Sequence, residues 1–332
     1  MKKNFIIGFI ISFIFVYLSL RGINFSELKE SLKSANYFYI FPGLFLVVLL
    51  LLVRSYRWGV MLGPLVKYNQ RTLFVITAIG FMVVSLIPAR IGEIARPFLV
   101  KQKSGVKMSS TLATVVVERI FDLLALMVLL FVVILVVPIP QALFNTGLTL
   151  LFISITAFLM LIFLAVKKDF SMSKAELVFN RLPQKPAGLL KKIFHAFVEG
   201  LQILPDIKKT LYIFFLSILV WTLNSATFFI VFYAFGFDLS FIDACAIMVI
   251  VAISVILPAP GFVGTFHYAC ILGLSYFGIA KTEAASYAVL LHFLQIAPLI
   301  LLGFVFLPFQ NLSLPKFIKD EEEAIKIEHL DE

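Results

Sequence analysis

The alternation of long apolar runs and short polar stretches predicts a chain built from membrane-spanning helices. Several runs reach the roughly 20 residues that an α-helix needs to cross a bilayer. Full spans are expected at residues 5–21, 38–62, 110–137, 148–166, 211–235 and 284–307. Four further apolar segments are short for a span and form two pairs, 73–88 with 94–100 and 243–257 with 264–278. The pattern predicts an all-α polytopic integral membrane protein, with about six full transmembrane helices and two re-entrant helical hairpins.

The charges of the connecting segments favour this arrangement. With the N-terminus in the cytoplasm, re-entrant hairpins keep every strongly basic connection on the cytoplasmic side, as the positive-inside rule requires. The most basic connection is the loop 167–210, which carries nine Lys or Arg against four acids. The charged C-terminal tail, 316–332, then lies in the cytoplasm too. A simple eight-span arrangement stays open, although a full crossing by 73–88 would put Lys101, Lys103 and Lys107 outside.

Two polar features are expected at the membrane surface. The segment 22–37 is amphipathic and is expected to lie in the interface. Arg54, Arg57 and Trp58 stand near the end of the span 38–62, where snorkelling arginines and an interfacial tryptophan are typical. The first apolar run has the basic start of a signal peptide but no small-x-small cleavage site, so a retained helix is expected.

The two short pairs occupy matching positions between full spans, which predicts an inverted repeat. Leu86-Ile87-Pro88-Ala89 corresponds to Ile256-Leu257-Pro258-Ala259, and glycines follow each. The expected hairpin-turn residues are Pro88, Gly92, Pro258, Pro260, Gly261 and Gly264. The inverted halves cover about 38–137 and 211–307 of a single membrane domain, 1–315. Broken helices at matching positions of two halves are typical of a transport site.

The composition excludes an ordinary soluble domain. Hydrophobic residues make up 61 % of the chain and charged residues 14 %, whereas a soluble domain is about half apolar and a quarter charged. The net charge of +9 is explained by basic connections that face anionic lipids, so no nucleic-acid partner is expected. Both cysteines stand in apolar sequence without a CxxC motif. No cofactor, P-loop, dinucleotide fingerprint or nucleophile elbow is indicated, and the sequence leans away from an enzyme.

A cluster of charges in and after the first short pair is the strongest functional signal. It consists of Arg90, Glu93, Arg96, Glu118, Arg119 and Asp122. Lone charges at membrane depth cost at least a few kcal/mol each. Glu118 and Asp122 share one helix face and are expected to pair with arginines across the hairpin, or to face water. One interpretation is an ion-pair cluster that clamps the hairpin. The other, which is compatible with it, is a headgroup site whose arginines bind phosphate.

The second short pair carries little charge. Its polar residues include His267, and His292 stands on the last span. The two imidazoles are able to face each other, and packing with a single hydrogen bond is the simpler interpretation for each. Two histidines without a third ligand do not make a metal site, so no metal is expected.

Three motifs resemble those of one family. They are Arg90-x-Gly92-Glu93-x-x-Arg96, Glu118-Arg119-x-x-Asp122 and Pro258-x-Pro260-Gly261-x-x-Gly264. Together they resemble the lysylphosphatidylglycerol synthase transmembrane-region family, also called the flippase-like domain family, over about 5–308. The resemblance implies a lipid-handling role, because the best-known member couples a lipid-moving membrane domain to a soluble aminoacyl-transferase. No such soluble domain is expected here, and stand-alone members are linked to polyprenyl-phosphate sugar or hopanoid pathways.

One departure from the family pattern concerns the two histidines. Where the family commonly has Glu after the second glycine motif and Arg on the last helix, this chain has His267 and His292. The paired exchange suggests that the two positions touch.

The expected function is transport of an anionic phospholipid or a polyprenyl-phosphate-linked lipid in the plasma (cytoplasmic) membrane of a prokaryote. The alternative is a membrane subunit, catalytic or not, of a lipid-modifying or glycosyl-transfer pathway, with a transferase partner. The transport hypothesis makes a geometric prediction. Pro88 and Pro258 should approach the membrane middle from opposite sides, and Glu118 and Asp122 should face the first hairpin.

Overall fold

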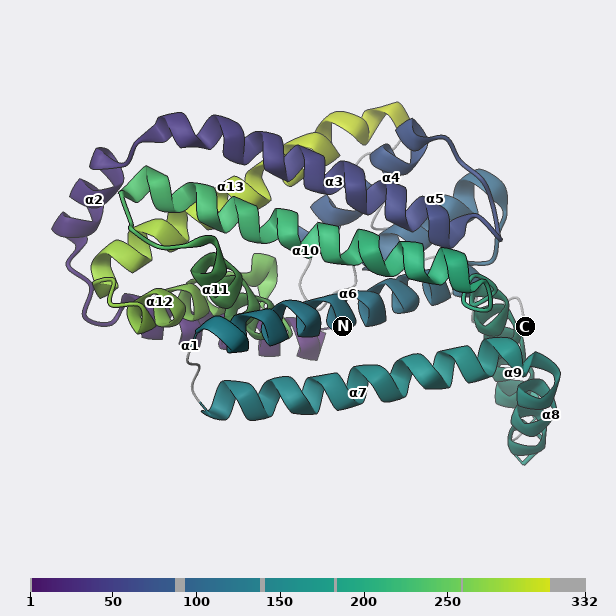
Figure 1. Ribbon diagram of the computed structural model, residues 1–332. Coiled ribbons are helices and arrows are strands. Elements are labelled where there is room, and N and C mark those ends of the chain that lie inside the picture. Colours follow the sequence, from purple (N-terminus) through teal and green to yellow (C-terminus); the bar gives the residue numbers. More distant parts are fainter. Residues whose placement is uncertain (1, 87–92, 138–140, 182–183, 258, 311–332) are drawn as a thin grey trace.

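The computed structural model describes residues 2–86, 93–137, 141–181, 184–257 and 259–310. Within these ranges all regular structure is helical, which confirms the all-α prediction. Five helices are long and apolar enough to cross a membrane, and they run roughly parallel as one bundle (Figure 1). They are α3 (Ile40–Leu62), α6 (Met108–Val136), α7 (Gln141–Val166), α10 (Ile207–Phe235) and α13 (Lys281–Phe306). The chain is therefore a multi-pass membrane protein.

A bent pair of helices at the N-terminus supplies the sixth candidate span. α1 (Lys2–Leu20) and α2 (Phe25–Ser34) meet at an angle of 86°. The side chain of Asn24 caps α2 by accepting hydrogen bonds from the backbone N–H groups of Ser26 and Glu27. This cap fixes the start of the helix where the chain turns. Counting the pair as one span gives six spans, the number expected from the sequence.

The four short segments fold into helices that form two packed pairs. α4 (Gln70–Leu86) packs on α5 (Ala95–Ser104), and α11 (Phe241–Ser254) packs on α12 (Thr265–Tyr276). The two pairs lie at opposite ends of the bundle (Figure 1). The order long, short, short, long thus occurs twice along the chain, in α3–α6 and in α10–α13. The segment from α7 to the start of α10 connects the two sets. The re-entrant course of each pair through a bilayer stays a prediction.

The described residues at the two turns touch each other inside the bundle. A Cβ on Gly261 would lie 3.1 Å from the carbonyl oxygen of Ser85 at the end of α4. Gly261 and Gly264 have φ angles of +54° and +89°, which L side chains rarely adopt, so glycine suits both positions. α12 begins directly after Gly264, as the sequence predicts. The expected turn residues Pro88, Gly92 and Pro258 lie outside the described residues.

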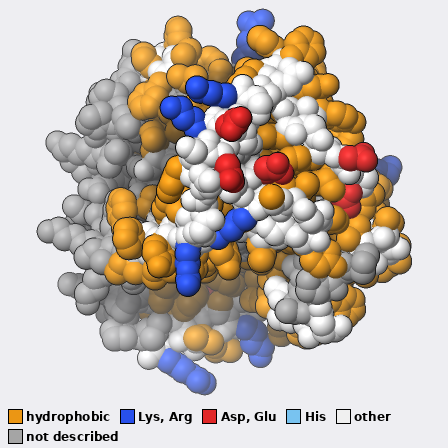
Figure 2. Space-filling view, turned by 90° about the vertical axis from the view of Figure 1, so that its left-hand side faces the viewer, with side chains coloured by type: hydrophobic (Ala, Val, Ile, Leu, Met, Phe, Trp, Pro, Cys, Tyr) orange, Lys and Arg blue, Asp and Glu red, His pale blue; other side chains and the backbone are white. Residues whose placement is uncertain are grey.

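The basic connection 167–210 contains two helices, although it was expected as a loop. α8 (Lys168–Phe179) and α9 (Gln184–Gly200) lie at the bundle end where α3 runs into α4 and where α6 begins (Figure 1). Asp206 then caps α10 by accepting a hydrogen bond from the backbone N–H of Lys209. Hydrogen bonds from Lys209 lower the pKa of the Asp206 carboxyl. Figure 2 shows the opposite end, which carries α2, with acidic and basic side chains exposed together.

The bundle buries polar groups inside and exposes apolar ones outside. Phe152 and Leu159 of α7 are largely exposed, as expected for side chains that face lipid acyl chains. Tyr287, in contrast, is fully buried and donates a hydrogen bond to the carbonyl oxygen of Phe228 at 2.7 Å. Satisfying such a donor inside the bundle avoids a desolvation cost of about 1–3 kcal/mol.

Cysteine labelling tests the two-pair arrangement. Lys67, Lys103 and Asp238 are exposed, while the native Cys245 and Cys270 are buried and unpaired. In oriented membrane vesicles, we expect Lys67→Cys and Lys103→Cys to react with an impermeant maleimide from one side, and Asp238→Cys from the other. If Lys103→Cys reacts from the same side as Asp238→Cys, then α4 and α5 carry the chain across the bilayer and the hairpin arrangement is wrong.

Candidate functional site

A buried arginine of α3 joins three helices at the centre of the site. Arg57 has no exposed surface. Its Nη1 donates hydrogen bonds to Asp122 Oδ1 at 2.6 Å and to Ser217 Oγ at 2.7 Å, and its Nη2 donates to Glu118 Oε1 at 3.0 Å. The acceptors stand on α6 and α10. Because a buried guanidinium without partners is costly, these contacts fix the positions of the three helices against one another.

Glu118 is the acid on which the other arginines converge. It is fully buried, and its Oε2 accepts a hydrogen bond from Arg96 Nη1 at 2.7 Å. Arg119 Nη2 lies 3.2 Å from Glu118 Oε1 and 3.3 Å from Asp122 Oδ2. Together with Arg57, these residues form the buried charge cluster: Arg57, Arg96, Glu118, Arg119 and Asp122. The expected pairing of the acid pair with Arg96 is confirmed for Glu118, whereas Arg90 lies outside the described residues.

Apolar and aromatic groups hold Arg96 in place. Its guanidinium carbon lies 5.0 Å from the ring centroid of Trp58, a cation–π distance. The indole Nε1 of Trp58 donates to Thr114 Oγ1 on α6 at 3.1 Å. A Cβ on Gly80 would lie 2.5 Å from Cγ of Arg96, so the glycine of α4 makes room for this side chain. Residues from three other helices, α3, α4 and α6, therefore fix the direction in which Arg96 points.

The snorkelling conformation expected for Arg57 and the interfacial exposure expected for Trp58 are not found. Both side chains are fully buried, although Arg57 stands only about 8 Å from the end of α3 by helical rise. The reason is the acid pair on α6, which offers two carboxylates at the same level. A buried, doubly paired guanidinium thus replaces the snorkelling conformation that an isolated arginine would adopt. The acid spacing, Glu118-x-x-x-Asp122, is the sequence signal that could have indicated this.

A cavity of about 430 Å³ lies directly beside the charge cluster. One side of it, the charged wall, consists of Arg54, Glu93, Arg96, Arg119 and Asp122. The other side, the amide wall, consists of Trp221, Asn224, His292 and Gln295 from α10 and α13. Apolar side chains complete the lining, including Leu50, Leu51, Leu126 and Phe228. The cavity is therefore amphipathic and is shared by both halves of the chain.

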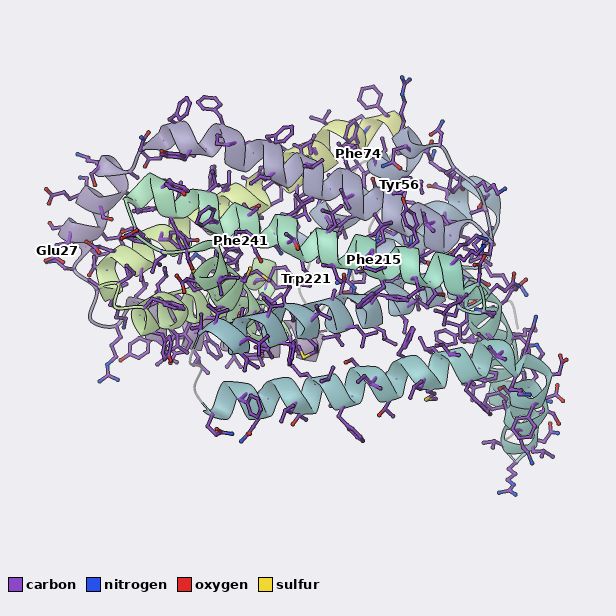
Figure 3. All side chains as sticks on the ribbon, in the orientation of Figure 1. Glu27, Tyr56, Phe74, Phe215, Trp221 and Phe241 are labelled. Carbon is purple, nitrogen blue, oxygen red and sulfur yellow. The ribbon has the colours of Figure 1, made fainter. Side chains whose placement is uncertain are left out.

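The amide wall is held together by its own hydrogen bonds. Gln295 Nε2 donates to Asn224 Oδ1 at 3.0 Å, and His292 Nε2 donates to the carbonyl oxygen of Gly261 at 2.9 Å. Figure 3 shows Trp221 on α10 at mid-length of the bundle, far from Glu27 on α2. The cavity thus lies near mid-length of the bundle, and the second turn contributes Phe262 to its wall.

The structure divides the expected headgroup residues into two groups. Glu93, Arg96, Arg119 and Asp122 line the cavity, and the side chains of Arg119 and Asp122 are 37 % and 10 % exposed. Glu118 does not line it. Sequence reasoning missed the cavity position of Arg54 and the whole amide wall except His292. Neutral amides inside apolar helices at Asn224 and Gln295 were the available signal, because such groups are costly in lipid without partners.

The two histidines touch, as the family comparison suggested. The ring centroids of His267 and His292 are 4.6 Å apart. Only His292 lines the main cavity, whereas His267 lines a second, mostly apolar space of about 170 Å³ bounded by α1, α2, α12 and α13. Among the described residues, no group of three or more His, Cys, Asp or Glu has metal-binding geometry. Chemically, the main cavity offers guanidinium donors to an anion and apolar walls to a chain.

These features define a multi-pass membrane protein with an amphipathic cavity beside a buried ion-pair cluster. The chain belongs to the lysylphosphatidylglycerol synthase TM region family, which matches residues 5–303. It is similar to two proteins of Methanothermobacter thermautotrophicus, each described as a UPF0104 membrane protein. One is 20 % identical over 89 % of this chain and 92 % of its own length, and the other is 25 % identical over 85 % and 86 %. No solved structure matches the chain significantly.

Removing the central guanidinium should destabilise the protein strongly. In Arg57→Gln, two buried carboxylates lose a partner, and breaking a buried pair costs about 3–5 kcal/mol. We expect the melting temperature in detergent, measured by size-exclusion chromatography after heating, to fall by roughly 10 °C. The matched control is Arg71→Gln at an exposed position, which should change it little. Equal shifts in both variants would show that the cluster does not hold the helices together.

Proposed function

We propose that this protein is a membrane lipid transporter that moves an anionic phospholipid or a polyprenyl-phosphate-linked lipid between leaflets. The observation that carries the proposal is the amphipathic cavity inside the helix bundle. Arginine side chains line one side of it, and apolar side chains line much of the rest. A lipid has the same two parts, a charged head and apolar chains, so head and chains each find a matching wall.

The size and position of the cavity support a headgroup site. Its volume of about 430 Å³ falls within the roughly 300–1,000 Å³ that small-molecule sites occupy. It is lined by residues of both four-helix sets, α3–α6 and α10–α13, here called the two helix quartets. Transporters with inverted repeats bind their substrates between such halves. The turn residues Ser85 and Phe262, one from each quartet, both contribute to its lining. A rearrangement of either turn would therefore change the shape of the cavity.

The division of the charges favours transport over catalysis. A general acid or base must exchange a proton with the substrate, yet Glu118 and Asp122 are both engaged by arginines. The ion-pair clamp and the headgroup site then use neighbouring residues of the same cluster. Arg57 and Glu118 form the clamp, and Arg119, Arg96 and Glu93 face the lipid head. A lipid-modifying subunit with a transferase partner is the alternative that the transport assay below separates.

The proposal includes a location and an orientation. The protein resides in the plasma membrane with its N- and C-termini in the cytoplasm. The bundle end that carries α8 and α9 then faces the cytoplasm, where their basic side chains meet anionic lipids.

A reconstitution assay tests the proposal. Purified protein in vesicles with a labelled anionic phospholipid should expose inner-leaflet label to an external quencher. Arg119→Gln removes a cavity-facing donor whose side chain is 37 % exposed, and we expect the rate to fall by about tenfold, the effect of roughly 1.4 kcal/mol in the transition state. Arg71→Gln should leave the rate unchanged.

Two other results would count against transport. If the wild-type protein moves no lipid, the proposed function fails. If Arg119→Gln moves lipid as fast as the wild type, the cavity is not the route. Co-purification with a transferase, together with an inactive wild type, would favour the subunit alternative.

A further inference from the structure

The cavity-facing stripe of α3 ends at an arginine. Val47, Leu50, Leu51 and Arg54 all line the cavity. Their spacing of i, i+3, i+4 and i+7 puts them on one helix face. Three apolar side chains are thus followed, one turn further along, by a guanidinium. A lipid lying along this face would place its chain against the apolar residues and its head against Arg54.

Arg54 differs from the arginines of the buried charge cluster in its partners. Each arginine of that cluster forms an ion pair with an acid of α6. Among the residues that the structure describes, Arg54 forms no ion pair. Its guanidinium carbon lies 5.0 Å from the ring centroid of Phe81 on α4, a cation–π contact that orients the group. The hydrogen-bonding edge of this guanidinium is therefore available to a ligand.

The neighbouring charges do not neutralise Arg54. Two acids and two arginines act on it: Asp122, Glu118, Arg119 and Arg57. These four are paired with one another, so their charges cancel. An uncompensated cation inside a membrane protein costs a few kcal/mol, and a bound anion would remove that cost. The planar fork of arginine suits a phosphate oxygen pair.

The site offers little to a positive group. The described residues that α10 and α13 contribute to the lining carry no Asp, Glu, Lys or Arg. Asn224 and Gln295 are bonded to each other. On the charged wall, Asp122 is paired with two arginines, and Glu93 interacts with Arg119. An ammonium in the cavity would have to break one of these pairs.

We propose that the site selects lipid heads whose net charge is negative, and that Arg54 is the residue that binds their phosphate. The inference rests on the proposed lipid function and adds the residue that binds the phosphate and the discrimination against zwitterionic and cationic heads. Zwitterionic and cationic heads carry an ammonium that the paired acids do not accept, so they bind less tightly than an anionic head with the same chains.

A binding experiment tests this without relying on transport. The full-length protein in nanodiscs is titrated with three lipids of identical acyl chains, and displacement of a fluorescent anionic lipid is measured. The three are phosphatidylglycerol (anionic), phosphatidylethanolamine (zwitterionic) and lysylated phosphatidylglycerol (cationic). We expect the wild type to prefer the anionic lipid by about tenfold or more, the effect of a charged hydrogen bond. Arg54→Gln should abolish this preference, and Arg71→Gln, at an exposed position, should keep it.

The conservative variant separates charge from geometry. Arg54→Lys retains the positive charge but loses the planar fork, so it should keep the order of preference with weaker binding of the anionic lipid. This variant and the wild type keep the inference testable even if Arg54→Gln does not fold.

The outcomes separate the inference from the proposed function. A folded Arg54→Gln protein that still prefers the anionic lipid would overturn the role of Arg54. A wild type that binds the cationic lipid as tightly as the anionic one would overturn the charge selection, while transport could still stand. If the wild type binds none of the three lipids and moves none in vesicles, the inference and the proposed function both fail.

Discussion

The need to neutralise one guanidinium inside an apolar bundle organises the structure. Arg57 stands within α3 with no exposed surface, and two carboxylates of α6 and a hydroxyl of α10 take up its donors. Removing either carboxylate would leave buried positive charge undercompensated, which is far more costly than losing an exposed ion pair. The relative positions of α3, α6 and α10 follow from this requirement. The cavity lies beside the cluster, so its charged wall has the same origin.

The apolar pattern was sufficient to predict most elements of the fold. Uninterrupted runs marked the long helices, and most of their ends in the structure lie within about four residues of those expected, as at 211–235 for α10. α7 differs, because it begins at Gln141 and not near 148. The other exception is 167–210, where α8 and α9 are helical although their sequence is polar and basic. A hydropathy pattern marks apolar segments, and it does not predict helices in polar sequence such as α8 and α9.

The candidate site could be predicted only for functional side chains that belong to a single helix. Glu118 and Asp122 are four residues apart on α6, so their shared face follows from helical geometry alone. Arg57 was expected to snorkel, because the sequence does not show whether another helix offers a carboxylate to an arginine near a helix end. Asn224 and Gln295 come from helices about 70 residues apart along the chain. No local spacing could bring these two amides together.

The frame of the cavity and its lining are set by different kinds of residue. The frame depends on places where no side chain fits. At Gly303, a Cβ would collide with Cβ of Met82, so α13 and α4 pack closely there. A Cβ on Gly261 would lie 3.1 Å from the carbonyl oxygen of Ser85. Part of the lining, such as Leu50 and Leu126, belongs neither to these contacts nor to the buried charge cluster. Exchanging one of these side chains leaves the glycine contacts and the ion pairs in place. The same helix packing can therefore present cavities that differ in ligand selectivity through single substitutions in the lining.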